Sequence, residues 1–363
     1  MSKEKMTSSA KHENFFDDFV TTRSKQAVEN GNETASEEQR CFQFFDRDGD
    51  GILNYEEFHH LCCQLLSLND QQWTKKETDK VLQLLVKKEE VDKEKFEYVW
   101  KSWIKPILSP KSTCLVVDVQ NDFITGSLAL KNAPAGENGE EVVPVINKLI
   151  QTVEFDKVIF SQDWYPDNHI SFYKNRHMRN SGKCFEMISI AADVVKELDT
   201  VVFAGSDGEP IEQTLWPAHC VQHSHGAKLH IDLQVEENHI IVKKGTNPDV
   251  DNYSALYSTP EPNNNESGPA LAKQLKDQGI TDVYACGLCE DICVAATVMD
   301  ACRLGFRTIL VEDAARASRP TDLKRQMETA GCLVVSSNEV SDMVSGLVRH
   351  PKLAHVTELN IIT

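Results

Sequence analysis

The sequence of 363 residues predicts an α/β domain preceded by a small all-α domain. The first observation is that short apolar segments alternate with helical patterns from residue 111 onward. Such segments indicate a parallel sheet with helices on both faces, which is a Rossmann-like three-layer domain. The second observation is that residues 38–107 show a helix, an acidic loop, a second helix and further helical pattern, as expected of an all-α domain.

The composition is that of an ordinary soluble protein, with 40% hydrophobic and 26% charged residues. A formal net charge of −18 argues against nucleic acid or an anionic membrane as a partner. No run approaches the ~20 apolar residues of a membrane span, and the polar segment 1–11 lacks the apolar stretch of a signal peptide. We therefore expect a cytoplasmic protein whose eleven cysteines are reduced thiols.

Changes in composition along the chain predict four regions. They are a flexible or partly helical leader (1–37), the all-α domain (38–107), the α/β domain (111–350) and a tail (351–363). The segment 105–110 is predicted to be a linker, because two prolines in quick succession stop a helix.

The segment 46–57 has the pattern of a calcium loop. Carboxylates occupy loop positions 1, 3 and 5, a glycine occupies position 6, and a glutamate occupies position 12. Ca²⁺ takes six to eight oxygen ligands, and such a loop must turn sharply at position 6. The pattern is that of an EF-hand, and its expected Ca²⁺ ligands are Asp46, Asp48, Asp50, Ile52 and Glu57.

EF-hands usually occur in pairs, and residues 91–96 align with residues 53–58 of the first loop. Val91 then matches Leu53, and Phe96 matches Phe58. Lys95, however, stands where the bidentate glutamate should be. The second hand is therefore predicted to be vestigial, so that it packs against the first without binding Ca²⁺.

The α/β domain is predicted to contain six strands and four longer helices. Ligand sites in such sheets lie at the carboxyl ends of the strands. The predicted strands are 113–118, 157–161, 240–243, 282–286, 307–311 and 332–336, and the predicted helices are 141–153, 269–278, 291–304 and 322–330.

Two charged side chains follow strands of this predicted sheet. Asp118 ends a buried strand, where burial would raise its pKa and suit a general base. The alternative is that Asp118 caps a turn or pairs with a lysine. Lys244 follows the strand 240–243, where its ammonium can hold a carboxylate or a thiolate. The alternative for Lys244 is an ordinary solvated strand end.

Cys293 lies in the first turn of the predicted helix 291–304. The positive end of a helix dipole can lower a thiol pKa from ~8.5 into the range ~3.5–7.5, and backbone N–H groups there can form an oxyanion hole. One alternative is that Cys293 is a small buried hydrophobe. Another is that it binds a metal with Cys286 and Cys289, but that set lacks a fourth ligand.

Asp163, His169 and His219 form a second group of candidates. One carboxylate and two imidazoles can hold Zn²⁺, Fe²⁺ or Mn²⁺ with open positions for water. Their spacing is too irregular to establish a site, since most of the twelve histidines must be incidental.

Taken together, these motifs resemble the isochorismatase-like cysteine hydrolases, and the nicotinamidases among them, over residues 111–348. The resemblance rests on five segments in order: 118–123, 163–172, 215–220, 244–255 and 293–301. It implies a catalytic triad of Asp118, Lys244 and Cys293. It also implies a cis peptide between Leu288 and Cys289, which would direct the Cys289 N–H toward the oxyanion beside that of Cys293.

The resemblance also implies a transition metal at Asp163, His169 and His219, with Zn²⁺ expected before Fe²⁺ or Mn²⁺. One position departs from the family pattern. The family usually has a histidine two residues after the metal aspartate, whereas this chain has Tyr165 there. A phenol is a poor substitute for an imidazole, so the metal shell has lost one nitrogen.

Phe123, Trp216 and Tyr253 match aromatic residues that line the pocket of nicotinamidases. The resemblance therefore implies a hydrolase that converts nicotinamide to nicotinate and ammonia through a cysteine thioester, with modulation by Ca²⁺ as a further hypothesis. One alternative is an amidohydrolase acting on a carbamoyl or ureido compound, whose pocket needs polar clamps. The other is a Ca²⁺-dependent interaction protein with an inactive hydrolase domain. The sequence leaves open whether the chain forms a homo-oligomer.

Overall fold

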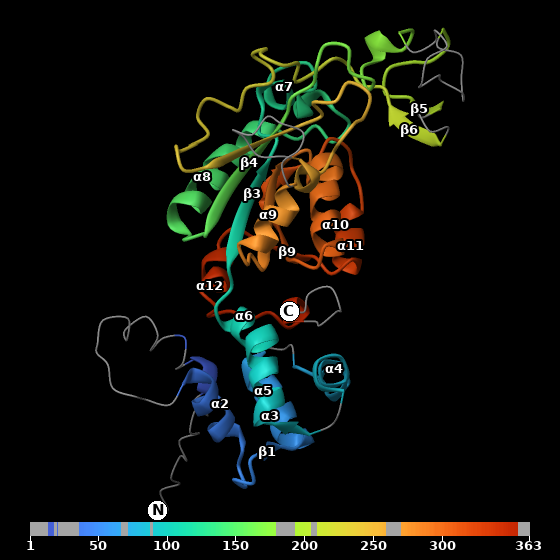
Figure 1. Ribbon diagram of the computed structural model, residues 1–363. Coiled ribbons are helices and arrows are strands. Elements are labelled where there is room, and N and C mark those ends of the chain that lie inside the picture. Colours follow the sequence, from blue (N-terminus) through green and yellow to red (C-terminus); the bar gives the residue numbers. More distant parts are fainter. Residues whose placement is uncertain are drawn as a thin grey trace, which may run out of the picture. The chain divides into compact units, whose positions relative to one another are not determined.

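The computed structural model describes residues 14–17, 20, 36–66, 72–87, 90–178, 193–204, 209–258 and 270–354. The chain divides into two compact units (Figure 1). The sheet unit comprises Lys111–Val344, and the helical unit comprises Met1–Pro110 together with Ser345–Thr363. The predicted domain 111–350 extends beyond the sheet unit, because the chain after Val344 belongs to the helical unit. Most of the predicted leader, and the last nine residues of the predicted tail (355–363), lie outside the described residues.

Six strands of the sheet unit form one sheet in which every neighbouring pair is parallel, so the predicted α/β class is confirmed. The strand order is β10-β9-β8-β3-β4-β7. The central strand β3 is buried along its whole length, as expected for a parallel sheet that is covered on both faces. The strands are β3 (Ser112–Val117), β4 (Lys157–Asp163), β7 (Ile240–Lys244), β8 (Asp282–Leu288), β9 (Arg307–Arg316) and β10 (Leu333–Val335).

Helices cover both faces of this sheet (Figure 1). α9, α10 and α11 share an apolar core with β3, β8 and β9 on one face. α8 lies on the other face and buries Val142, Ile146 and Leu149, which recur at helical spacing. The longer helices are α8 (Val142–Thr152), α9 (Leu271–Asp277), α10 (Ala295–Arg303) and α11 (Leu323–Thr329). The shorter ones are α7 (Asn121–Ile124), η3 (Leu130–Asn132), η4 (Gly139–Glu141), η5 (Tyr173–Asn175), η6 (Ala255–Tyr257), η7 (Glu290–Val294) and α12 (Val340–Val344).

The strand order reverses its direction between β3 and β8. From β3 the chain adds β4 and β7 on one side, and it then returns to add β8, β9 and β10 on the other. In doubly wound sheets, the carboxyl ends of the strands at such a reversal border the ligand site. The ends of β3, β4, β7 and β8 are therefore the place where functional side chains should meet.

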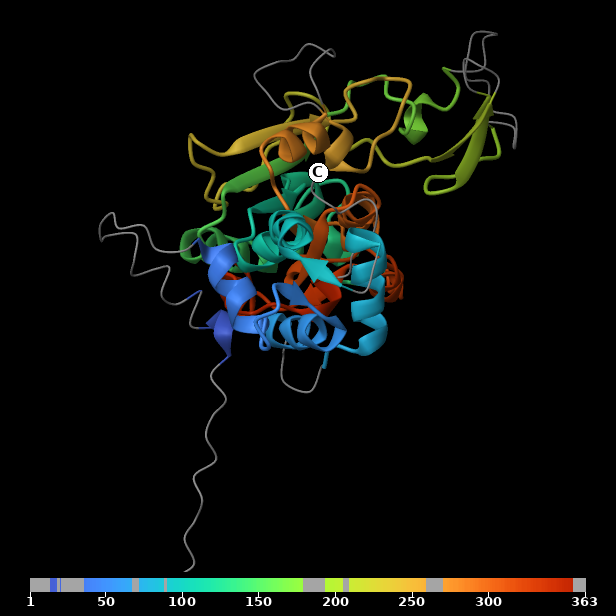
Figure 2. The same cartoon turned by 60° about the horizontal axis from the view of Figure 1, so that its bottom comes forward.

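A second, two-stranded sheet was not predicted from the sequence. β5 (Thr200–Ala204) and β6 (Pro210–Thr214) pair antiparallel and project from the main sheet in both cartoon views (Figures 1 and 2). Val201 and Phe203 pack in a small apolar cluster with Leu215. β6 begins with a proline and is largely polar, so its sequence carries little strand pattern.

The helical unit contains two helix–loop–helix segments. Their loops are joined by a short antiparallel pair, in which Leu53 lies opposite Val91. Phe58 and Phe96, which the alignment also matched, are both buried in the core of the unit. Its elements are α2 (Glu37–Phe45), β1 (Ile52–Leu53), α3 (Tyr55–Leu65), α4 (Lys75–Val81), η1 (Leu82–Val86), β2 (Val91–Asp92), α5 (Lys93–Val99), η2 (Trp100–Ile104), α6 (Lys105–Leu108) and η8 (Pro351–Ala354).

The predicted linker 105–110 is wrong in part, because Lys105–Leu108 continues the helical unit as α6. α6 follows η2 without a break in the helical backbone, and Pro106 is its second residue. The segment after Val344 also packs here. The Arg349 side chain donates to the Leu65 carbonyl at 2.7 Å, and the Trp103 indole donates to the Ala354 carbonyl at 3.0 Å.

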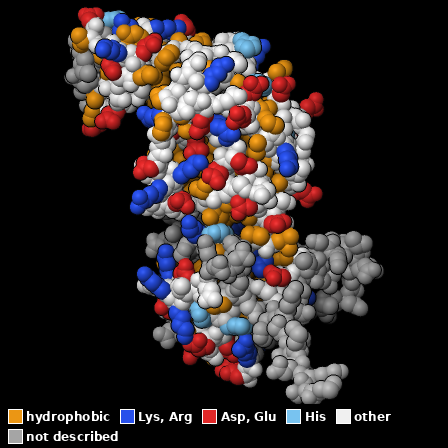
Figure 3. All heavy atoms as spheres, turned by 180° about the vertical axis from the view of Figure 1, so that it is seen from behind, with side chains coloured by type: hydrophobic (Ala, Val, Ile, Leu, Met, Phe, Trp, Pro, Cys, Tyr) orange, Lys and Arg blue, Asp and Glu red, His pale blue; other side chains and the backbone are white. Residues whose placement is uncertain are grey.

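On the face seen in Figure 3, acidic, basic and apolar side chains are interspersed over the surface of the described residues. None of the described helices has the length and apolar character that crossing a membrane would require.

Candidate active site

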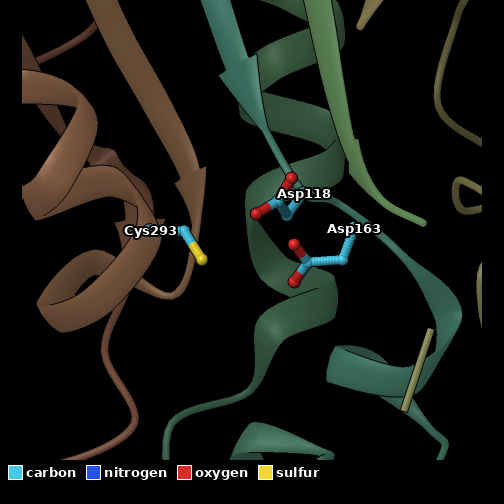
Figure 4. A group of neighbouring side chains, drawn as sticks. All are labelled: Asp118, Asp163 and Cys293. Atoms are coloured by element: carbon cyan, nitrogen blue, oxygen red, sulfur yellow. The ribbon is translucent and has the colours of Figure 1, made fainter. Parts of the chain in front are cut away.

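Four side chains from four neighbouring elements meet at the carboxyl end of the sheet. Asp118 follows β3, Asp163 ends β4, Lys244 ends β7, and Cys293 lies in the first turn of the helix after β8. Figure 4 shows the Cys293 thiol directed toward the two carboxylates. One ligand atom each from Asp118, Asp163 and Cys293 lies within 4.8 Å of the others. The fold thus places three residues predicted as a triad, together with Asp163, in one cluster.

Lys244 lies at the centre of this cluster and is only 1% exposed. Its Nζ atom is 2.9 Å from Asp118 Oδ2 and 3.3 Å from Cys293 Sγ, and it also contacts Asp163 Oδ1. Burial by itself would lower the pKa of this ammonium, but Asp118, Asp163 and Cys293 together raise the pKa well above its usual value. The ammonium therefore stays charged and holds both carboxylates.

Asp118 adopts a φ of 50°, which is the left-handed region that aspartate tolerates better than most residues. Its Oδ1 atom accepts a hydrogen bond of 2.7 Å from the Ser161 hydroxyl, and Oδ2 faces Lys244. Backbone strain of this kind persists where the surrounding structure enforces it, as it does at many functional sites. The conformation fixes the direction of the carboxylate toward the cluster.

The Cys293 thiol is buried, and burial raises its pKa well above the usual value although Lys244 opposes the shift. The prediction that the helix dipole lowers the pKa of Cys293 is therefore wrong, because desolvation of the thiol has a larger effect than the dipole. A thiol of this kind needs a base to take its proton when it reacts. The peptide bond between Leu288 and Cys289 is cis.

Gln120 was not predicted from the sequence, yet it fixes Asp163. Its Nε2 atom donates to the Asp163 carbonyl, and its Oε1 atom accepts from the Asp163 N–H, both at 2.8 Å. Burial raises the pKa of the Asp163 carboxyl to about 7, although Lys244 lowers it. No local sequence pattern distinguishes such a buried glutamine from an ordinary core residue.

A pocket of about 330 Å³ opens onto the cluster. Phe123, Trp216 and Tyr253, the three predicted pocket aromatics, all line it. Cys293 and Asp163 form part of its wall. This size lies at the lower end of the range ~300–1,000 Å³ that is usual for small-molecule sites, so a single aromatic ring can be enclosed beside the thiol.

The orientation of His219 suits a metal ligand. Its Nδ1 atom is 2.8 Å from the Pro217 carbonyl and must donate to it, so Nε2 presents a lone pair. Nε2 is 4.0 Å from Asp163 Oδ2. Burial lowers the pKa of His219 to about 4, which keeps the ring neutral. These two atoms could share one divalent cation.

His169 does not complete this pair. The Ser171 N–H and hydroxyl lie 3.3 and 2.7 Å from its Nδ1 atom, and its Nε2 atom lies 3.3 Å from the Val250 carbonyl. Nδ1 therefore accepts, Nε2 donates, and neither nitrogen presents a lone pair toward Asp163. The three predicted ligands do not form a group with all ligand atoms within 4.8 Å, because this hydrogen bonding turns His169 elsewhere.

Tyr165 occupies the position where the sequence departs from the family pattern. Its ring is buried and contacts the rings of His169 and His219, with centroid distances of 4.4 and 5.1 Å. Its hydroxyl donates to Asp251 at 3.1 Å. Burial raises the pKa of Tyr165 well above its usual value, so the phenol remains a neutral hydrogen-bond donor.

Comparison with known proteins matches residues 112–339 to the isochorismatase domain model. The nicotinamidase of Acinetobacter baylyi is 35% identical over 204 residues, which are 56% of this chain and 80% of that protein. The nicotinamidase of Escherichia coli is 34% identical over 209 residues, 57% of this chain and 84% of that protein. The structure of the yeast nicotinamidase Pnc1p has a TM-score of 0.50 and 27% identity, covering 62% of this chain and 99% of that one.

The neutral state of His219 predicts a pH dependence of stability. Its pKa is about 4 in the folded chain against 6.5 in the unfolded chain, so the unfolded chain binds more protons between these values. The contribution of His219 to the free energy of unfolding is therefore complete above pH 6.5. Toward pH 4 this contribution is lost, by on the order of 1.4 kcal/mol per pH unit. The measurement is urea denaturation of metal-free protein at several pH values.

The control for this prediction is His219→Asn, which can still donate to the Pro217 carbonyl but cannot titrate. Asp163 acts in the opposite direction, because its raised pKa weakens the folded state as the pH rises toward 7. Only the difference in free energy of unfolding between the wild type and His219→Asn isolates the effect of His219. If this difference in free energy of unfolding is the same at pH 7 and at pH 5, His219 is not held neutral in the folded chain.

Proposed function

The chain belongs to the isochorismatase family and is an amidohydrolase, and we propose that it hydrolyses nicotinamide to nicotinate and ammonia with Cys293 as the nucleophile. The observation that carries this proposal is the contact of Lys244 with both Asp118 and Cys293 beneath a pocket lined by aromatic rings. A buried thiol beside a carboxylate base is suited to covalent attack on an amide, and the aromatic walls suit a pyridine ring.

Asp118 acts first as a general base and takes the proton of the Cys293 thiol. The sulfur then attacks the amide carbon, and the N–H groups of Cys289 and Cys293 hold the oxygen that becomes negative. Asp118 returns the proton to the amide nitrogen, the carbon–nitrogen bond breaks, and ammonia leaves. A thioester between Cys293 and the nicotinoyl group remains.

Asp118 next takes a proton from a water molecule that attacks the thioester carbon. The carbon–sulfur bond breaks, the proton held by Asp118 passes to the Cys293 sulfur, and the new carboxylic acid loses the second proton of the water to solvent and leaves as nicotinate. Lys244 stays protonated throughout, because its ammonium faces Asp118 in every step. Its charge favours Asp118 as a carboxylate and the sulfur as a thiolate, which are the two reactive forms.

We also propose that Asp163 and His219 hold one divalent transition metal, Zn²⁺ first and Fe²⁺ or Mn²⁺ otherwise. The support is the 4.0 Å between Asp163 Oδ2 and His219 Nε2, which matches two ligands of a shared cation. Such a metal would supply a Lewis acid toward the pyridine nitrogen. His169 is not included in this proposal, because both of its nitrogens are engaged elsewhere.

In the helical unit we propose an EF-hand that binds Ca²⁺ at Asp46, Asp48, Asp50, Ile52 and Glu57. Oxygens of the three aspartates lie within 4.8 Å of one another, and Gly51 has a φ of 85°, which the turn at loop position 6 needs. In the second loop the Lys95 ammonium lies 2.7 Å from Asp92 and 3.2 Å from the Glu90 carbonyl. An ammonium in place of the glutamate supports a hand that does not bind Ca²⁺.

The assay that tests the main proposal is ammonia release from nicotinamide by the purified chain. Cys293→Ala is expected to abolish turnover and to keep the fold, since it removes only the nucleophile. Cys302→Ala is the matched control, because Cys302 is a half-buried thiol on α10 and should not matter. Amidase activity in Cys293→Ala, or its loss in Cys302→Ala alone, would exclude Cys293 as the nucleophile.

Elemental analysis of protein cleared of Ca²⁺ tests the metal site. The wild type is expected to hold about one equivalent of Zn, Fe or Mn per chain. His219→Ala should lose this metal, because it removes one of two protein ligands, while His169→Ala should keep it. Metal that is retained in His219→Ala and lost in His169→Ala would reverse the assignment.

Calorimetry tests the calcium site. One site is expected, with a Kd of about 10⁻⁷–10⁻⁵ M. Glu57→Gln should abolish binding because it weakens the twelfth loop ligand, while the exposed neighbour Glu56 provides the control Glu56→Gln. Two sites would contradict the vestigial second hand. Equal kcat/KM with and without Ca²⁺, in protein shown to bind it, would leave Ca²⁺ without a role in catalysis.

A further inference from the structure

Two side chains beside the pocket, Tyr165 and Gln213, donate to one carboxylate, that of Asp251. The Tyr165 hydroxyl donates to Asp251 Oδ1 at 3.1 Å. The Trp216 indole donates to the Tyr253 hydroxyl at 3.2 Å, and burial together with the charge of Asp251 raises the pKa of that hydroxyl. Tyr165, Trp216 and Tyr253 all line the pocket, whereas Asp251 lies behind them.

The same carboxylate reaches the β5–β6 hairpin. Gln213, a buried residue of β6, donates to Asp251 Oδ2 at 2.9 Å. The next residue, Thr214, is part of the pocket wall. The two oxygens of Asp251 thus link the segment that carries Tyr165 to the end of the β5–β6 hairpin.

The position of the Tyr165 ring depends on Gly245. A Cβ atom at Gly245 would lie 2.2 Å from Tyr165 Cε1, a distance that real contacts do not reach. Gly245 also has a φ of 69°, which disfavours other residues. Because Gly245 follows Lys244 directly, the backbone that carries the buried ammonium also leaves room for the Tyr165 ring.

We propose that Asp251 is a positioning residue which sets the width of the pocket and thereby the affinity for an aromatic amide. It accepts the hydrogen bonds of Tyr165 and Gln213, and its charge acts on the neighbouring Tyr253 hydroxyl, so that these interactions fix the walls of the pocket before a ligand arrives. This inference rests on the proposed function for its substrate, but the network itself is independent of it. Tyr165, which departs from the family pattern, is in this view a wall residue whose hydroxyl Asp251 holds.

The network predicts a specific kinetic change. The pocket walls contact the ring of the substrate equally in the bound substrate and in the transition state. Losing these contacts should therefore weaken the binding of both to the same extent. Asp251→Ala is expected to raise KM for nicotinamide about tenfold, with kcat per active site changed by less than about twofold. Asp251→Asn retains one acceptor oxygen and should restore part of the affinity.

Active sites are counted by alkylation of Cys293, so that loss of folded protein is not mistaken for a change in kcat. Asp277→Asn, at an exposed aspartate of α9, and Tyr257→Phe, at an exposed tyrosine, are the matched controls. Tyr165→Phe should raise KM in the wild type and have little further effect in Asp251→Ala, because contacting residues are not additive. If Asp251→Ala does not fold, Asp251→Asn and Tyr165→Phe carry the same test.

A measurement without substrate separates this inference from the proposed function. In chain labelled with 5-fluorotryptophan, the Trp216 resonance is assigned through Trp216→Phe. Asp251→Ala and Tyr165→Phe should shift it, and the controls should not. If the wild type does not hydrolyse nicotinamide, the proposed function fails. The Trp216 resonance alone then decides whether Asp251 positions the pocket walls. An unshifted resonance, or a wild-type KM in Asp251→Ala, overturns the inference.

Discussion

The contact of the Lys244 ammonium with two buried carboxylates is the interaction on which the arrangement of the site depends. An ammonium that is 1% exposed would lose its proton if it were alone, whereas Asp118 and Asp163 keep it charged. Removing one partner of such a buried pair typically costs about 3–5 kcal/mol, because the remaining charge is left without compensation. The ends of three parallel strands must therefore stay in place together. The strand order β8-β3-β4-β7 satisfies this requirement, since the carboxyl ends of neighbouring parallel strands share one edge.

This dependence explains which parts of the site could be predicted from the sequence. Asp118, Lys244 and Cys293 each follow or end a recognisable apolar strand, so the sheet brings them together whatever the details of the loops. The pKa of Cys293 could not be predicted in the same way, because its helix position favours a lower pKa while burial, which depends on the whole fold, raises it. Gln120 and Asp251 act through contacts with residues more than thirty positions away, and no local pattern marks them. The β5–β6 hairpin escaped prediction because half of it is polar.

The same ammonium limits what Asp163 can bind. Its Oδ1 atom faces Lys244, so only Oδ2 is directed toward His219. Two protein donors are few for a structural metal and suit a site that keeps open positions. A third nitrogen could have come from residue 165, but Tyr165 places its hydroxyl on Asp251 instead. The exchange of an imidazole for a phenol would therefore remove a donor from the proposed metal site, and it adds a hydrogen bond between the pocket wall and Asp251.

Lys95 in the helical unit, compared with Lys244, shows that exposure to water determines how strongly an ammonium is held by its partners. Both Lys95 and Lys244 lie beside carboxylate oxygens, but the Lys95 side chain is 30% exposed, and water weakens its attraction to Asp92. A partly solvated lysine can leave its partners, whereas Lys244 cannot do so without exposing two buried charges. In the proposed second hand the ammonium would act mainly by standing where a glutamate ligand is needed, which removes a negative charge and adds a positive one. In the proposed active site the same chemical group stays charged, because Asp118 and Asp163 outweigh the effect of burial, and it lies 3.3 Å from the Cys293 thiol.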